Sequence, residues 1–148
     1  MRVPDQIRKC VAFIGYKMAD GSPRFMGSAL LFGDDTTDPK YACMITARHV
    51  IDGIRDRGLT EVWLRLNAKS GRCEWIPTDL SHWICPEDAS LDISIYIGYL
   101  NDQADHMILA RQLALIPAIA QTVNAGVGDE IFITGLFANY AGDLRKCR

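Results

Sequence analysis

The sequence predicts an all-β fold of six short antiparallel strands, arranged as a small barrel or sandwich. Two stretches, residues 61–69 and 91–100, alternate apolar and polar side chains with the period of a strand that has one buried face. The other apolar runs are short, and turn-forming stretches such as ADGSP and DDTTDPK separate them. With 148 residues, of which 49% are apolar, the chain is long enough for one domain with a hydrophobic core.

The expected strands follow one another through the first hundred residues. Six segments have strand character, namely 11–17, 24–33, 41–51, 61–69, 73–80 and 91–100. The two that alternate most clearly place three apolar residues on one side: Val62, Leu64 and Leu66 in the first, Ile93, Ile95 and Ile97 in the second. Each of these faces is typical of a strand in an antiparallel sheet.

After residue 100 the pattern changes. Residues 101–126 are rich in Ala, Leu and Ile without alternation, and we interpret them as a connector with a short helix that Pro117 stops or kinks. Residues 127–137 (VGDEIFITGLF) are expected to form one more strand. The G-x-G of AGVGDEI does not indicate a dinucleotide site, because Ile131 stands where a third glycine is required.

Composition argues against several classes of partner. The net charge of −2 and the pI of about 5.9 give no support to a nucleic-acid-binding face. No run is long and apolar enough to span a bilayer, so no membrane partner is expected. The polar start MRVPDQIRKC lacks the apolar region of a signal peptide, which predicts a cytoplasmic protein.

The five cysteines indicate neither a disulfide framework nor a metal site. Their number is odd and their spacing irregular, and Cys10 and Cys43 lie in apolar runs typical of core residues. A zinc site at Cys73, His82 and Cys85 lacks a C-x-x-C pair. We therefore expect no metal and no cofactor.

His49 is the first candidate functional residue. It stands in YACMITARHVIDG, where an apolar strand ends and a short loop or helical turn should begin. Strand ends are where a rigid scaffold presents a side chain to a cleft, although a lone histidine there is usually structural. The other two histidines, His82 and His106, lie in stretches that favour surface or packing roles.

Asp92 is the candidate partner of His49. It opens the last alternating strand between Leu91 and Ile93, where a carboxylate is costly to bury unless a partner accepts its charge. An imidazole N–H is such a partner, because the carboxylate fixes the tautomer and stabilises the imidazolium formed in catalysis. The alternative is that Asp92 is a turn residue that only starts a strand.

Four motifs, GSALLFG, ITARHVID, LDISIYIG and VGDEIFITGLF, occur in this order. Together they resemble the trypsin-like serine peptidases of the chymotrypsin fold, and more closely the bacterial HtrA-like or intracellular branch. In that family a T-A-x-H motif carries the catalytic histidine and a D-I/L-A/S motif the catalytic aspartate. The resemblance covers roughly residues 8 to 137 and implies that His49 and Asp92 hold these two roles.

The resemblance implies a fold of two six-stranded antiparallel barrels with the active site between them. Residues 8–100 would be the N-terminal β-barrel, 101–126 the linker and 127–148 the start of an incomplete second barrel. The expected activity is peptide-bond hydrolysis by a serine endopeptidase with a Ser-His-Asp triad, acting on a peptide or protein substrate.

The family's nucleophile has no counterpart in this sequence. No serine follows Ser94, Ser28 lies in an expected barrel strand, and no glycine loop that could form an oxyanion hole surrounds Cys147. We therefore expect a truncated peptidase domain that is inactive alone. In it, the strand at 127–137 would lack cover for its apolar residues, and would fold back on the first barrel or cause self-association.

Two other classes of protein remain open. The first is a catalytically dead, protease-like β-barrel that serves as a protein-binding module. The second is a plain small barrel in which His49 and Asp92 never meet, which a separation of more than about 5 Å would indicate.

Overall fold

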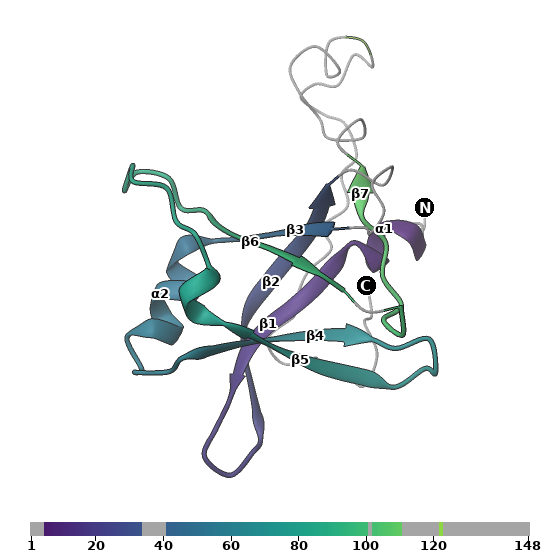
Figure 1. The fold of residues 1–148 in the computed structure, drawn as a ribbon, viewed down its shortest axis with the longest axis horizontal. Helices are drawn as coiled ribbons and strands as arrows, with labels where there is room; N and C mark the ends of the chain where they lie inside the picture. The colour runs from purple at the N-terminus through teal and green to yellow at the C-terminus, as the bar shows by residue number, and fades with distance from the viewer. Residues whose placement is uncertain (1–4, 34–40, 101, 111–121, 123–148) are drawn as a thin grey trace, which may run out of the picture.

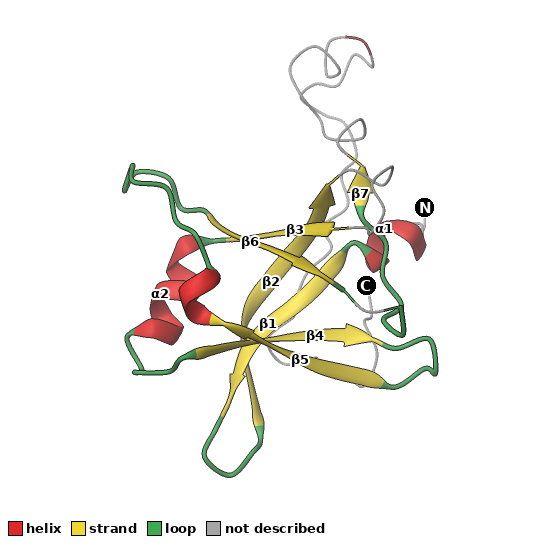
Figure 2. Cartoon of the chain, in the orientation of Figure 1, coloured by secondary structure: helices red, strands yellow, loops and turns green. Residues whose placement is uncertain are grey.

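A curled antiparallel sheet dominates the computed structural model, which describes residues 5–33, 41–100, 102–110 and 122 (Figures 1 and 2). Six strands in the order β5-β4-β1-β2-β3-β6 form a half-barrel, and a short seventh strand, β7, lies beside β2. The elements are α1 (Asp5–Lys9), β1 (Val11–Lys17), β2 (Pro23–Gly33), β3 (Tyr41–Thr46), α2 (Arg48–Arg55), β4 (Glu61–Asn67), β5 (Cys73–Asp79), the 3₁₀ turn η1 (Leu80–His82), β6 (Ser94–Tyr99) and β7 (Leu109–Ala110). The predicted sheet of six antiparallel strands is thus confirmed, in the form of a half-barrel.

Alternate strand residues build the core on the inner face of the sheet. The three apolar residues predicted to share a side of β4, namely Val62, Leu64 and Leu66, are all fully buried. Every second residue of β3 is also buried, and Ala42 and Met44 contribute to the same cluster. This is the period of two residues that places one face of each strand in the core.

In β6 the alternation is as expected, but its isoleucines lie on the outer face. Ser94 is fully buried and Tyr96 packs against the core, whereas Ile97 is 63% exposed and Tyr99 is 51% exposed. The register with β3 accounts for this, because Tyr96 pairs with the inward-facing Met44. The strand also begins only at Ser94, three residues later than expected.

Helix α2 replaces the last residues of the strand expected at 41–51. The strand ends at Thr46, and Val50, Ile51 and Ile54 lie on one face of the following helix, where all three are buried. Their spacing is helical rather than alternating, so a helix buries them together and a strand would not. The Thr46 hydroxyl donates to the Ser28 carbonyl oxygen (2.9 Å) and joins the end of β3 to β2.

Gly27 lets α2 approach the sheet closely. A methyl group at position 27 would lie 2.9 Å from Cγ2 of Val50, which is too close for two carbon atoms. Valine is stiff about its first side-chain torsion, so it can retreat only if the helix moves with it. The glycine of the GSALLFG motif therefore fixes how α2 packs against β2.

The segment that follows β5 brings the two ends of the sheet order together. Ile84 exchanges two backbone hydrogen bonds of 2.8 Å with Ile95 of β6. Just before it, Trp83 is buried and its Nε1 donates to the Thr78 hydroxyl (3.0 Å). The two edge strands of the sheet are β5 and β6, and the segment that follows β5 pairs with β6 at Ile84 and Ile95. This contact curls the sheet.

Parts of the predicted organisation lie outside the described residues. These are the strand expected at 127–137, the start of a second barrel at 127–148, and Cys147. Of the expected linker, the structure describes 102–110 and 122, and it contains β7, which pairs in parallel with β2 through Phe32 and Leu109. Among the described helices, none has the length and apolar character needed to cross a bilayer.

The close packing at Gly27 predicts a specific mutational coupling. Gly27→Ala should lower the free energy of unfolding by about 1–3 kcal/mol, because the added methyl group overpacks the contact with Val50. Removing the clashing methyl groups with Val50→Ala should recover part of that loss, so the double variant should be more stable than the sum of the single variants predicts. Urea denaturation of the four proteins measures the coupling.

A matched control is Gly27→Ala combined with Ile54→Ala, since Ile54 is buried on the same helix and is not among the nearest neighbours of the added methyl group. These two effects should add within about 0.5 kcal/mol. If the effects of Gly27→Ala and Val50→Ala on the free energy of unfolding also add within this limit, the proposed close contact is wrong.

Candidate active site

His49 is the second residue of α2, directly beyond the end of β3. The buried face of the helix anchors it to the sheet, and this leaves the His49 side chain 73% exposed. Asp92 lies at the other side of the site, two residues before β6, and its side chain is 56% exposed. Since β3 and β6 are paired neighbours, the end of one strand and the start of the other lie at the same edge of the sheet.

The Asp92 carboxylate contacts His49 at two points. Its Oδ2 lies 2.7 Å from the ring Nδ1, and its Oδ1 accepts the backbone N–H of the same residue at 2.9 Å. The separation is far shorter than the value that would indicate an accidental pair of residues. The structure therefore brings the two predicted residues together, while their catalytic role stays a prediction.

Asp92 also caps the N-terminus of α2. The N-cap residue of the helix is Ala47, which has no side-chain group to accept the first amides, and no side-chain cap is formed there. Asp92, which lies 43 residues after His49 in the sequence, accepts the His49 backbone N–H and so supplies the missing acceptor. A carboxylate in this position is also favoured by the positive end of the helix dipole.

The same contacts hold the pKa of Asp92 below its ordinary value. The largest cause is the hydrogen bond from the His49 backbone N–H, and the bond from the His49 ring comes next. Both favour the charged carboxylate over the neutral acid. Asp92 is consequently ionised at neutral pH and can accept from the His49 ring.

The bond to Asp92 selects one tautomer of the neutral His49 ring. A carboxylate only accepts, so Nδ1 of the neutral ring carries the proton and Nε2 keeps its lone pair. Nε2 has no hydrogen-bond partner in the described part of the chain, and the ring is largely open to solvent. A histidine held in this way can take a proton at Nε2 and pass it on.

No serine in the described residues is placed to use that nitrogen. Ser28 is part of β2, where its carbonyl oxygen accepts from Thr46, and Ser94 is fully buried. The hydroxyl of Ser94 donates to the Ile84 carbonyl oxygen (3.3 Å) and accepts from Cys85 Sγ (3.4 Å). Within the described residues, the His49 ring thus has Asp92 as its hydrogen-bond partner, and no serine hydroxyl is bonded to it.

An open cavity of about 450 Å³ adjoins Asp92. It is open to solvent, and most of its lining residues are apolar. The lining residues are Val11, Ser28, Ala29, Leu30, Ile45, Thr46, Ala47, Asp92 and Ile93. Among the residues that line this cavity, Asp92 alone carries a charge. An apolar surface of another domain could therefore pack there without burying further charge.

The sequence did not reveal the apolar surface that continues from this cavity along β3 and β6. Seven side chains without a charge follow one another there through cross-strand pairs, and we call them the outer strip: Tyr41, Cys43, Ile45, Ile84, Ile95, Ile97 and Tyr99. The only signal in the sequence was the repeated isoleucine of β6. Read without the register, that repeat does not tell the inner face from the outer one.

The remaining candidate residues do not form a second site. His82 ends η1, and His106 Nδ1 lies 3.1 Å from the Ala104 carbonyl oxygen. Within the described residues, no three His, Cys, Asp or Glu side chains are grouped so that they could hold a metal ion. Cys10 is buried, and partial burial raises the pKa of the Cys43 thiol.

Comparisons with protein-family models, with curated proteins and with solved structures find no match to this chain.

The two contacts of Asp92 can be separated by mutation. In His49→Ala the ring bond is lost and the backbone N–H bond remains, so the pKa of Asp92 should rise only part of the way to its ordinary value. An NMR titration of the Asp92 carboxyl carbon measures this. Asp79 and Asp88, whose pKa values are lowered by Ser81 and Ser90, serve as internal controls that should not move. A complete return of Asp92 to its ordinary pKa would show that the helix cap does not persist without the ring.

The depressed pKa of Asp92 also fixes the sign of a pH effect on stability. A group whose pKa is lower in the folded state stabilises the fold above its unfolded pKa, and that contribution is lost as the pH falls through the folded pKa. The native protein should thus be more stable than Asp92→Asn at neutral pH, and the difference should vanish in acid. Urea denaturation from neutral to acidic pH tests this, with Leu91→Ala, which changes no titratable group, expected to differ from the native protein by a constant amount. A pH-independent difference for Asp92→Asn would contradict the assignment.

Proposed function

We propose that this chain contains the first β-barrel domain of a trypsin-like serine endopeptidase, in which His49 is the general base and Asp92 the orienting carboxylate. The observation that carries the proposal is the two-point contact of Asp92 with the amide and the ring of His49. A single carboxylate that binds both groups fixes the tautomer and the direction of the ring, and a Ser-His-Asp triad requires both.

In this mechanism each residue has one task. Nε2 of His49 takes the proton of a serine hydroxyl while the serine oxygen attacks the peptide carbonyl, and then gives the proton to the leaving amine. Asp92 keeps the proton of the ring on Nδ1 and stabilises the imidazolium that forms between the two steps. The proposal assigns the serine and the oxyanion hole to a polypeptide segment other than residues 1–148.

The outer face of the sheet supports the proposal that the base and the nucleophile lie in different domains. The cavity beside Asp92 and the outer strip form a continuous apolar surface, because Ile45 belongs to both. Contiguous exposed apolar surfaces on a globular domain mark places where another protein surface packs. A second domain packed there would stand next to the His49 ring, where the nucleophile is needed.

The same surface favours a second candidate function. A catalytically dead barrel that binds another protein through the outer strip would need the exposed Tyr41, Ile97 and Tyr99, and it would use Asp92 only as the cap of α2. The two functions differ in whether His49 ever accepts a proton from a nucleophile.

Reaction with a fluorophosphonate probe distinguishes the two functions. Residues 1–148 alone should not be labelled, because within the described residues no nucleophile adjoins His49. The complete polypeptide made in the source organism should be labelled on a serine. Asp92→Asn should slow that labelling by about 10⁴-fold, as expected when the orienting carboxylate of a triad is neutralised. His82→Ala is the matched control and should react at the native rate.

Stoichiometric labelling of residues 1–148, or native-rate labelling of the complete His49→Ala polypeptide, would refute the proposal. A complete polypeptide that is not labelled at all would favour the binding module.

A further inference from the structure

We infer that Arg48 is a positioning residue for the His49–Asp92 pair, because it ties the outgoing end of the loop that carries Asp92 to the helix that carries His49. The catalytic meaning of this role rests on the proposed function, whereas the restraint itself does not.

The loop between η1 and β6 needs such a restraint. It leaves the sheet after Ile84 and returns at Ile95, where the two residues exchange backbone hydrogen bonds. Between them, residues 87–92 are all exposed, and Figure 1 shows the loop projecting beside α2. Within the loop, Asp88 accepts from Ser90, and this bond shapes the tip without fastening it to the rest of the domain.

Arg48 fastens the outgoing end of the loop. Its Nη1 donates to the Pro86 carbonyl oxygen at 3.3 Å, and its Nε donates to Asp52 Oδ2 at the same distance. Asp52 lies one turn further along α2 and holds the guanidinium in place. The returning end is bound by Asp92, which accepts from His49, so neighbouring residues of one helix turn hold the two ends of the loop.

The chemistry of arginine suits this position. A planar guanidinium presents several N–H groups in a fixed geometry, so one side chain can donate to a carboxylate and to a carbonyl oxygen together. A lysine ammonium keeps the charge but lacks the rigid fork. The bond to Pro86 crosses 38 residues of sequence, and its loss would leave Asp92 as the only described side-chain link between the exposed part of the loop and α2.

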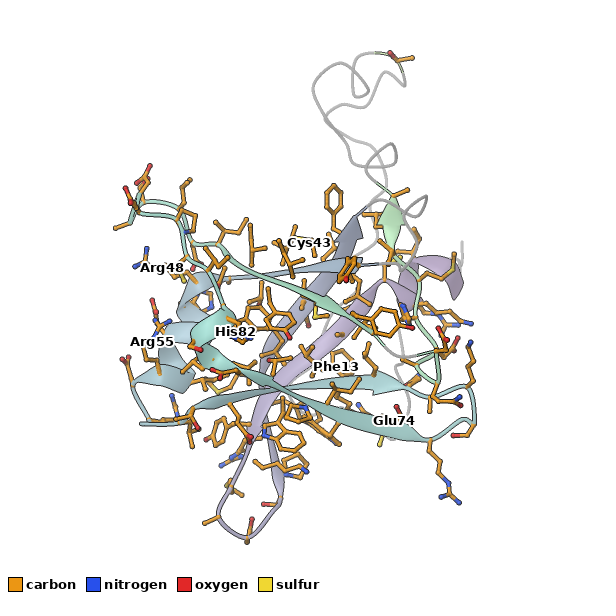
Figure 3. The ribbon with its side chains drawn as sticks, viewed as in Figure 1. Phe13, Cys43, Arg48, Arg55, Glu74 and His82 are labelled. Carbon is orange, nitrogen blue, oxygen red and sulfur yellow. The ribbon has the colours of Figure 1, made fainter. Side chains whose placement is uncertain are left out.

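Arg55 offers a matched comparison. It lies on the same helix, carries the same charge and also pairs with Asp52. Figure 3 shows both arginines on the α2 side of the molecule, with Arg48 nearer to the loop. Within the described residues Arg55 has no hydrogen bond to the loop. It therefore has the charge and the Asp52 ion pair of Arg48, but it does not restrain the loop.

Amide hydrogen exchange in residues 1–148 tests the inference without any peptidase activity. In Arg48→Met the amide of His49 should exchange about tenfold faster, as expected for the loss of about one net hydrogen bond to a charged group. In Arg55→Met it should exchange at the native rate. The amide of Asp56, which donates to the Asp52 carbonyl oxygen at the other end of α2, should be unchanged in both variants. Arg48→Lys should lie between native and Arg48→Met.

Unchanged exchange at His49 in Arg48→Met, or an equal change in Arg55→Met, would overturn the inference. Faster exchange at Asp56 as well would show a loss of the whole helix rather than of the restraint, and would also count against it. Because these measurements involve no nucleophile, their outcome is independent of the labelling result that decides the proposed function. If Arg48→Met does not fold, Arg48→Gln, which keeps a donor without the fork, gives the same comparison.

Discussion

The Asp92 carboxylate joins two parts of the chain that are distant in sequence, the loop before β6 and the N-terminus of α2. Ala47 cannot cap this helix, so the first amides depend on an acceptor from elsewhere. Because one oxygen binds the amide of His49 and the other binds its ring, backbone and side chain of the same residue are oriented together. The bond to the amide fixes the carboxylate relative to the helix, and the bond to Nδ1 then orients the ring, and with it Nε2.

A helix cap by itself does not account for this geometry. A cap needs only one acceptor oxygen, and at N-cap positions serine and asparagine serve about as well as aspartate. The cap also places no demand on the His49 ring, which is 73% exposed and is not among the residues packed against the core. The second oxygen, on Nδ1, is thus an addition that helix stability does not require, and it is the part of the contact that a general base requires.

Sequence patterns predicted those features of the fold and site that depend on local periodicity. The alternation in β4 identified Val62, Leu64 and Leu66 as core, and the position of His49 at a strand end and of Asp92 among apolar residues pointed to a contact. The inner face of β6 could not be predicted, because Ser94 and Tyr96 turn inward through their register with β3. The role of Arg48 depends on a carbonyl group, and no side-chain pattern in the sequence reports where a carbonyl will lie.

Exposure to water limits what the His49–Asp92 pair can do in the described domain. Charged groups that share a hydrogen bond in water gain little from their attraction, because solvent screens them. The attraction grows when water is excluded, since the effective dielectric constant falls. In the proposed peptidase, a second apolar surface packed on the cavity and the outer strip would remove water beside Asp92 and introduce no opposing charge. The imidazolium formed on His49 would then be stabilised more strongly than in the isolated domain. In the proposed peptidase, one packed surface would thus have two effects: it would bury the apolar outer strip, and it would exclude water from the His49–Asp92 pair and so make His49 a more effective base.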